Sequence, residues 1–310
     1  MSASPELPLA EYQFNFQVLQ NLWLPEFSGS LWHSVFGYAL KNSVCIRHGF
    51  TCDDCFLLHS CDYSYLYSTP RPLKTDIMRN YQTIPAPHII RTEHTKPKLI
   101  VAGETLSLRF ILIGKANEKL PLIIWSLLKA GSKGIGKSRS KLQLQEVWQL
   151  LNKDTAELIY QPNEIKTQPI IKPLTIITMP ERVTLEFLTP YRQNDKQFNK
   201  DTTDIKKLLM AIIRRVSLLQ YFYTGQELNA DFKQLKTLSE QLSINPQLEN
   251  KFHQRYSSKH RALLSASGVI GQLEIDLNGM DALWEYLYLG QWLNVGKNAS
   301  MGFGQYQLIF

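Results

Sequence analysis

Residues 296–306 read Gly-Lys-Asn-Ala-Ser-Met-Gly-Phe-Gly-Gln-Tyr, and an alternating run of residues continues from there to Phe310. Glycine has no Cβ, so Gly296, Gly302 and Gly304 can adopt positive φ angles and bring backbone N–H groups close to a ligand. Such N–H groups form an anion site, which here would lie beside Lys297 and suit a phosphate. The loop precedes a strand and not a helix, which excludes the phosphate loop of nucleotide-hydrolysing enzymes. A tight turn before a strand is the alternative interpretation.

A second glycine-rich loop lies near the middle of the chain, between an expected helix at 120–130 and an expected strand. Residues 131–141 read Gly-Ser-Lys-Gly-Ile-Gly-Lys-Ser-Arg-Ser-Lys, without an acidic residue. Clustered cations usually form a solvated surface, but the glycines and serines among them add donors that can follow a sugar–phosphate backbone. We therefore expect nucleic-acid contact at Lys133, Gly134, Gly136, Lys137, Arg139 and Lys141.

The order of the expected elements is the same in both halves of the chain: strand, helix, strand, helix, glycine loop, strand. The first half has strand 12–18, helix 31–41, strand 104–113 and helix 120–130. The second half has strand 182–188, helix 204–223, a polar helical insertion at 225–250, strand 263–275 and helix 281–289. This is the split β-α-β plan of a ferredoxin-like fold. The sequence predicts an α+β protein with two tandem ferredoxin-like (RRM-like) domains, at 1–170 and 171–310.

All four cysteines of the chain fall in one short window, at Cys45, Cys52, Cys55 and Cys61. Four thiolates at this spacing can close on one tetrahedral ion, which predicts a small metal knuckle at about 45–61, inserted in the first domain. Zinc is the preferred ion, an iron–sulfur cluster uses the same ligands, and His48 or His59 could replace a weak ligand. Ordinary packing of small apolar cysteines is the alternative.

Composition narrows the class of partner. The chain has 310 residues and a net charge of +7, which favours a polyanionic partner. No apolar run is long enough for a membrane helix, and the N-terminus lacks the pattern of a secretory signal. We therefore expect a cytoplasmic protein that does not bind membranes. RNA is favoured over DNA, because no base-reading recognition helix follows the cysteines.

Five motifs, which occur along the chain in the same order as in the family, make the chain resemble the RAMP superfamily. The resemblance is closer to the CRISPR-associated endoribonucleases that cut precursor repeat RNA into guide RNAs. The strongest is Asn294–Tyr306, which is similar to the glycine-rich C-terminal loop of that family. The others are Cys61-Asp-Tyr, Gly103-Glu-Thr-Leu-Ser-Leu, Gly134-Ile-Gly-Lys and Arg255-Tyr-Ser-Ser. The resemblance adds Arg255 and Lys259 to the expected RNA-binding residues.

The resemblance implies metal-independent cleavage that needs no cofactor. The 2′-hydroxyl attacks the adjacent phosphate, which leaves a 2′,3′-cyclic phosphate, and the enzyme stays bound to its product. Several members place a histidine on or near the first helix, so His33 is the predicted general base or acid, with Tyr38 and Lys41 as helpers. Where this branch commonly has Leu-Arg-Gly, the chain has Trp32-His33-Ser34. A histidine with a purely structural role is the alternative for His33, and His260 is the second candidate.

A different class of function remains open from the sequence. A related RAMP module could bind guide RNA without cutting it, as a subunit of a CRISPR effector or adaptation complex. The expected partners are CRISPR repeat RNA or guide RNA in both cases, with other CRISPR-associated proteins as further partners. Only the acid–base residue separates the two hypotheses.

Overall fold

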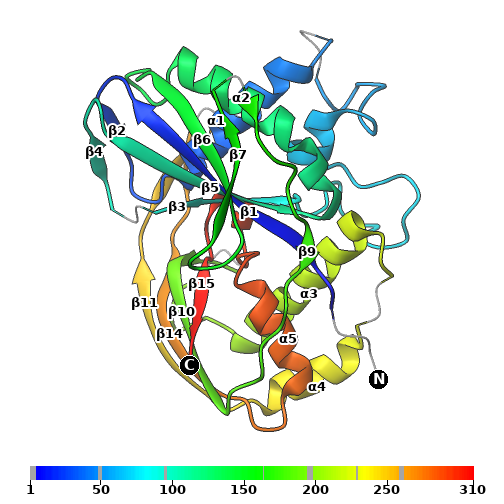
Figure 1. Ribbon diagram of the computed structural model, residues 1–310. Helices are drawn as coiled ribbons and strands as arrows, with labels where there is room; N and C mark the ends of the chain where they lie inside the picture. The colour runs from blue at the N-terminus through cyan, green and yellow to red at the C-terminus, as the bar shows by residue number, and fades with distance from the viewer. Residues whose placement is uncertain are drawn as a thin grey trace. The chain divides into compact units, whose positions relative to one another are not determined.

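The computed structural model describes residues 5–47, 51–93, 96–162, 164–193, 198–227, 230–257 and 262–310. The chain forms two compact units (Figure 1). One unit is Leu9–Ile171, and the other combines Met1–Pro8 with Lys172–Phe310. Among the described residues, no helix has the length and apolar character needed to cross a membrane.

The unit Leu9–Ile171 is built on an antiparallel sheet with the strand order β3-β5-β1-β6-β7-β8. Its strands are β1 (Pro8–Val18), β3 (His88–Thr92), β5 (Thr105–Ile113), β6 (Leu142–Leu150), β7 (Ala156–Gln161) and β8 (Glu164–Ile165). The period-two pattern of β1 buries Tyr12, Phe14 and Phe16 completely and leaves the alternate side chains half-buried. One face of the sheet therefore carries the core of this unit.

Two helices cover that apolar face, α1 (Gly29–Val44) and α2 (Leu120–Lys133), with the short 3-10 helix η2 (Gly114–Lys119) before α2. Phe36 of α1 packs edge-on against Phe110 of β5, with 5.3 Å between the ring centroids. Trp32 stacks on Phe16 of β1 at 5.6 Å. A separate two-stranded sheet joins β2 (Leu22–Leu24) to β4 (Lys98–Ile100).

The second unit repeats the plan with the strand order β11-β14-β10-β15. Its strands are β10 (Arg182–Tyr191), β11 (Ile244–Lys251), β14 (Gly268–Asp276) and β15 (Tyr306–Ile309), and its helices are α3 (Ile205–Thr224), α4 (Phe232–Gln241) and α5 (Asp281–Gly290). A hairpin of β12 (Gln254–Ser257) and β13 (Ala262–Ser265) precedes β14, and β9 (Lys172–Pro173) precedes β10. Asp204 caps α3, its carboxylate accepting the N–H of Lys207.

Both units share one topology. In chain order the core of each unit has strand, helix, two strands, helix and strand, and in each sheet the first of these four strands lies between the third and the fourth. This order defines the ferredoxin-like fold. The predicted α+β class and the tandem ferredoxin-like architecture are confirmed.

Two segments differ from the sequence-based expectation. Residues 225–250 were predicted as a helical insertion, but only α4 is helical there, and 244–251 form the edge strand β11. Its burial pattern is mostly exposed, so β11 lacks the apolar alternation that marks a strand. The proline-rich connection Tyr65–Pro97 also contains more order than predicted, including the strand β3 and the single-turn π-helix η1 (Ser64–Ser68).

Candidate functional site

The terminal glycine loop has the left-handed backbone that its sequence predicts. Gly296, Gly302 and Gly304 have φ angles of 85°, 87° and 63°, and Asn298 has a φ of 64°. A Cβ at Gly304 would overlap the carbonyl oxygen of Val295, so this position requires glycine.

The backbone N–H groups of this loop hold the loop itself. Lys297 donates to the carbonyl of Arg192 at 3.0 Å, Gly302 to Ala299 at 3.1 Å, and Gly304 to Pro190 at 2.9 Å. These three donors are engaged with protein carbonyls and are not presented to a phosphate. The side chain of Lys297 is exposed, so an anion can reach its ammonium.

A second cation lies directly before the loop. Arg215 of α3 donates from Nε to the carbonyl of Leu293 at 2.7 Å. Its Nη2 is buried and makes no hydrogen bond within the described part of the chain. Burial lowers the pKa of Arg215 to about 10, so the guanidinium keeps its charge at neutral pH. The sequence left Arg214 and Arg215 as possible solvated helix charges, and only Arg214 is exposed.

The first glycine loop forms a tight turn in the unit Leu9–Ile171. Ile135 and Ser140 exchange both backbone hydrogen bonds, at 2.9 and 3.0 Å, and the Ile135 side chain is buried. Gly134, Gly136 and Arg139 have the positive φ angles of the turn. The exposed cations of the turn and its flanks are Lys133, Lys137, Arg139 and Lys141, and none of them forms an ion pair with a described carboxylate. This arrangement leaves four cations available to a polyanion.

His33 lies on the inner face of α1 and is only 7% exposed. The hydroxyl of Tyr67 and Nδ1 of His33 are joined by a hydrogen bond of 3.0 Å. The ring of Tyr67 comes this close because residue 37 is glycine, since a Cβ there would overlap the ring. His33 also stacks against His88 of β3, with 5.5 Å between the centroids.

The aromatic stack continues from His33 towards Lys41. Tyr63 stacks on Tyr67 with 5.3 Å between the ring centroids. The Lys41 ammonium lies 5.7 Å from the centre of the Tyr63 ring. The structure thus places the predicted residues His33 and Lys41 along one stack. The third predicted residue, Tyr38, is 70% exposed and takes no part in it.

Tyr67 and His88 were missed by the sequence reasoning, which took residues 65–97 as an irregular connection. Tyr63 was noted only as the end of the Cys61-Asp-Tyr motif. A usable signal was present, because Tyr63 and Tyr67 are four residues apart and such a pair shares one face of a helical turn. Burial raises the pKa of Tyr63, with smaller contributions from Tyr67 and from the thiols Cys52, Cys61 and Cys45. Three of the four cysteines therefore lie near this end of the stack.

The cysteine segment is a series of tight turns between α1 and η1. Cys55 donates its N–H to Cys52 at 3.1 Å, and Cys61 donates to Leu57 at 2.9 Å. Within the described residues, which omit 48–50 and with them His48, no three His, Cys, Asp or Glu side chains are grouped closely enough to hold a metal ion. The four thiols are free and half-buried, and His59 is exposed. The arrangement described does not fit a closed metal site, so the knuckle stays a prediction.

Arg255 lies half-buried on β12, opposite Leu264 of β13. The other basic residue predicted next to it, Lys259, and the second catalytic candidate, His260, lie outside the described residues. The structure therefore adds no geometry for these two positions.

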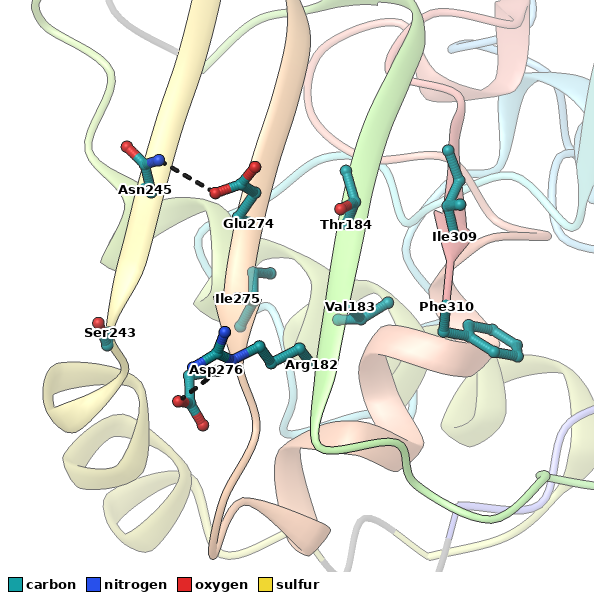
Figure 2. Close-up of a pocket in the computed structure, with 10 residues that line it drawn as sticks. All are labelled: Arg182, Val183, Thr184, Ser243, Asn245, Glu274, Ile275, Asp276, Ile309 and Phe310. Atoms are coloured by element: carbon teal, nitrogen blue, oxygen red, sulfur yellow. Dashed lines mark hydrogen bonds and ion pairs between the residues drawn. The ribbon is translucent and has the colours of Figure 1, made fainter.

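The sheet of the second unit carries a hollow of about 520 Å³ at one end of its strands (Figure 2). Asn245 donates from Nδ2 to Oε2 of Glu274 at 3.1 Å, and Nε of Arg182 lies 3.9 Å from Oδ2 of Asp276. None of the predicted site residues lines this hollow. Its carboxylates disfavour a phosphate backbone, because like charges repel in a site of this kind.

Comparisons with known proteins find family models that match each part of the chain. A family model called AF_1859_N, an N-terminal domain, matches residues 7–171. The model of the CRISPR-associated endoribonuclease Cas6 matches residues 185–306. No curated protein sequence matches this chain significantly.

Solved structures are similar over nearly the whole chain. The product complex of Cas6 TTHB231 from Thermus thermophilus has a TM-score of 0.56 at 15% identity, and the match covers 97% of this chain and 100% of that one. The product complex of Cas6 TTHA0078 has a TM-score of 0.54 at 15% identity, covering 98% and 100%. A partial Cas6-RT-Cas1–Cas2 complex has a TM-score of 0.53 at 13% identity, covering all of this chain and 47% of that one. The model of the CRISPR-associated endoribonuclease Cas6 thus covers most of the second unit, and the solved Cas6 structures show that the whole chain has the Cas6 fold.

Proposed function

We propose that this chain cuts the repeat RNA of CRISPR transcripts into guide RNAs in the cytoplasm and stays bound to its product. The family supports RNA cleavage, and two of the similar structures are product complexes. The observation that carries the proposal is the imidazole of His33, fixed on α1 by the hydroxyl of Tyr67 at 3.0 Å. An oriented histidine is the side chain best suited to proton transfer near neutral pH.

The proposed reaction requires no metal ion. The 2′-oxygen forms a bond to the adjacent phosphorus, the bond from phosphorus to the 5′-oxygen breaks, and a 2′,3′-cyclic phosphate and a 5′-hydroxyl result. A base takes the proton of the 2′-hydroxyl, and an acid protonates the leaving 5′-oxygen. His33 supplies one of these roles through Nε2, because Nδ1 is engaged by Tyr67. Such proton transfer contributes about 10²–10⁴-fold to the rate.

Lys41 and Tyr38 have supporting roles in this proposal. The ammonium of Lys41, on the same stack as His33, would stabilise negative charge on the phosphorane. Tyr38 is far more exposed than His33, so it would contact RNA that lies over the outer surface of α1. RNA binding away from the chemistry is assigned to the exposed cations of the two glycine loops and to Arg255.

The burial of His33 favours one alternative function. At 7% exposure the imidazole reaches RNA only if Tyr67 or the turn that carries it moves when RNA binds. A RAMP subunit that binds guide RNA without cutting needs no such movement. One of the similar structures is a partial Cas6-RT-Cas1–Cas2 complex, so other CRISPR-associated proteins are proposed as partners for either function.

Incubation with the repeat RNA of the same genome in EDTA tests the proposal. We expect a single cut whose upstream fragment has the mass of a 2′,3′-cyclic phosphate, and we expect the cut to disappear in His33→Ala. Asn42→Ala, at an exposed position of the same helix, is the matched control, with RNA affinity measured for both variants. Tight binding without cleavage by the wild-type protein would support the binding subunit instead. Cleavage that needs a divalent ion would refute the metal-independent chemistry.

A further inference from the structure

The small sheet of β2 and β4 carries an exposed apolar surface. Trp23 of β2 pairs directly with Leu99 of β4, and their side chains are 60% and 46% exposed. Leu19 before β2 and Val101 after β4 are each 47% exposed. Figure 1 shows the two strands lying together, apart from the main sheet of the unit. Contiguous apolar exposure of this kind usually marks a binding surface.

The segment before Trp23 holds the basic turn of residues 134–141. Leu19 donates its N–H to the carbonyl of Lys141 at 2.9 Å. Lys141 in turn donates its N–H to Oε1 of Gln20 at 3.2 Å, and Ser140 donates its hydroxyl to the carbonyl of Asn21 at 2.6 Å. The exposed indole and the exposed cations of the turn are therefore parts of one continuous surface.

The indole of Trp23 offers an uncovered ring face. Among the described residues, no second aromatic ring and no cation packs against it. The comparison is Trp125 of α2, which is similarly exposed at 52%. The ammonium of Lys129 lies 4.5 Å from the centre of the Trp125 ring and occupies its face.

We propose that Trp23 is a stacking site for an unpaired base of the RNA, whose phosphates contact the basic turn beside it. The proposal rests on the proposed function, and it adds a base subsite to it. Single-stranded RNA is bound by this combination, in which cations follow the backbone and aromatic rings stack on bases regardless of sequence. The charge of the basic turn favours RNA over a protein partner, because no acidic residue occurs between Lys119 and Gln145.

Equilibrium binding of fluorescently labelled repeat RNA tests the stacking site. We expect Trp23→Ala to raise Kd about 5- to 150-fold, the range of alanine substitution at a stacking aromatic residue. Trp23→Phe should restore most of the affinity, and Trp125→Ala should leave Kd unchanged. The slope of log Kd against log salt should not change in Trp23→Ala, whereas Lys137→Ala should lower it by about 0.7–0.9. Far-ultraviolet circular dichroism checks that the variants are folded.

The outcomes separate this inference from the proposed function. If the wild-type protein does not bind the repeat RNA, the proposed function fails. If it binds and cuts RNA while Trp23→Ala matches Trp125→Ala, only the stacking site is refuted. A loss of Cas1–Cas2 binding in Trp23→Ala, with unchanged RNA affinity, would also refute it and would identify a protein-docking surface.

Discussion

Replacing Gly304 with alanine tests whether the terminal glycines serve the fold of the loop. Gly304 has a φ of +63°, and a Cβ there would overlap the carbonyl oxygen of Val295. The left-handed conformation costs an alanine about 1–2 kcal/mol. The overlap also displaces two backbone hydrogen bonds of 2.9 Å, from Val295 to Gly304 and from Gly304 to Pro190. At about 0.5–1.5 kcal/mol for each bond, the total loss of unfolding free energy is about 2–5 kcal/mol.

Gly225→Ala is the matched control for this substitution. Gly225 ends α3 with a φ of +78°, but no atom lies within 4 Å of its added Cβ. It carries only the conformational cost, about 1–2 kcal/mol. Urea titration should give a lower midpoint for Gly304→Ala than for Gly225→Ala, with the slopes unchanged. Equal stability of the two variants would refute the reasoning, since it would mean that the loop accommodates a Cβ at Gly304 without losing its hydrogen bonds.

Three further predictions concern the stack, the cysteines and alkaline pH. Tyr67→Phe keeps the ring on Gly37 but removes the hydroxyl bonded to His33. We therefore expect cleavage about 2- to 13-fold slower and a shifted pH–rate profile, with unchanged RNA affinity. An unchanged pH–rate profile would count against a positioning role for Tyr67. Protein purified without chelator should contain about one zinc per chain if Cys45, Cys52, Cys55 and Cys61 form a closed site. If elemental analysis detects neither zinc nor iron, the four cysteines only fill space in the packing of this segment. Burial raises the pKa of Tyr65 to about 12, so this phenol stabilises the fold below its unfolded pKa of about 10. The stabilisation of the fold by Tyr65 is lost as the pH rises from about 10 to about 12. Equal urea midpoints of the wild type and Tyr65→Phe at every pH from 9 to 12 would contradict this prediction.

The fold was predictable because its main elements carry strong periodic signals. The alternation in β1 and the apolar face of α3 each predict one element, and the glycine loops repeat at the same place in both units. β11 and β3 were not predictable in this way. β11 is an edge strand with little apolar content, and β3 follows a proline-rich stretch that predicts irregular structure. Both are specified by pairing with strands distant in sequence.

The candidate site was only partly predictable. His33 and Lys41 were found because they lie on a predicted helix and have the right chemistry. The partners of His33, Tyr67 and His88, lie 34 and 55 positions further along the chain, and contacts over such separations leave no local pattern. The use of the loop N–H groups was equally hidden, because a glycine loop that binds phosphate and one that bonds to its own protein have the same composition.

The internal hydrogen bonds of the terminal loop have an entropic consequence for binding. Ordering a flexible backbone costs about 1–2 kcal/mol per residue, and a mobile loop would lose this amount each time a ligand bound. Here the backbone hydrogen bonds from Lys297, Gly302 and Gly304 to protein carbonyls order the loop when the protein folds, before any ligand binds. An RNA strand that binds at Lys297 contacts a backbone that is already fixed, so binding costs no conformational entropy in this loop. Release of the strand likewise gains no conformational entropy from the loop. Slow product release is the kinetic behaviour that such preorganisation favours.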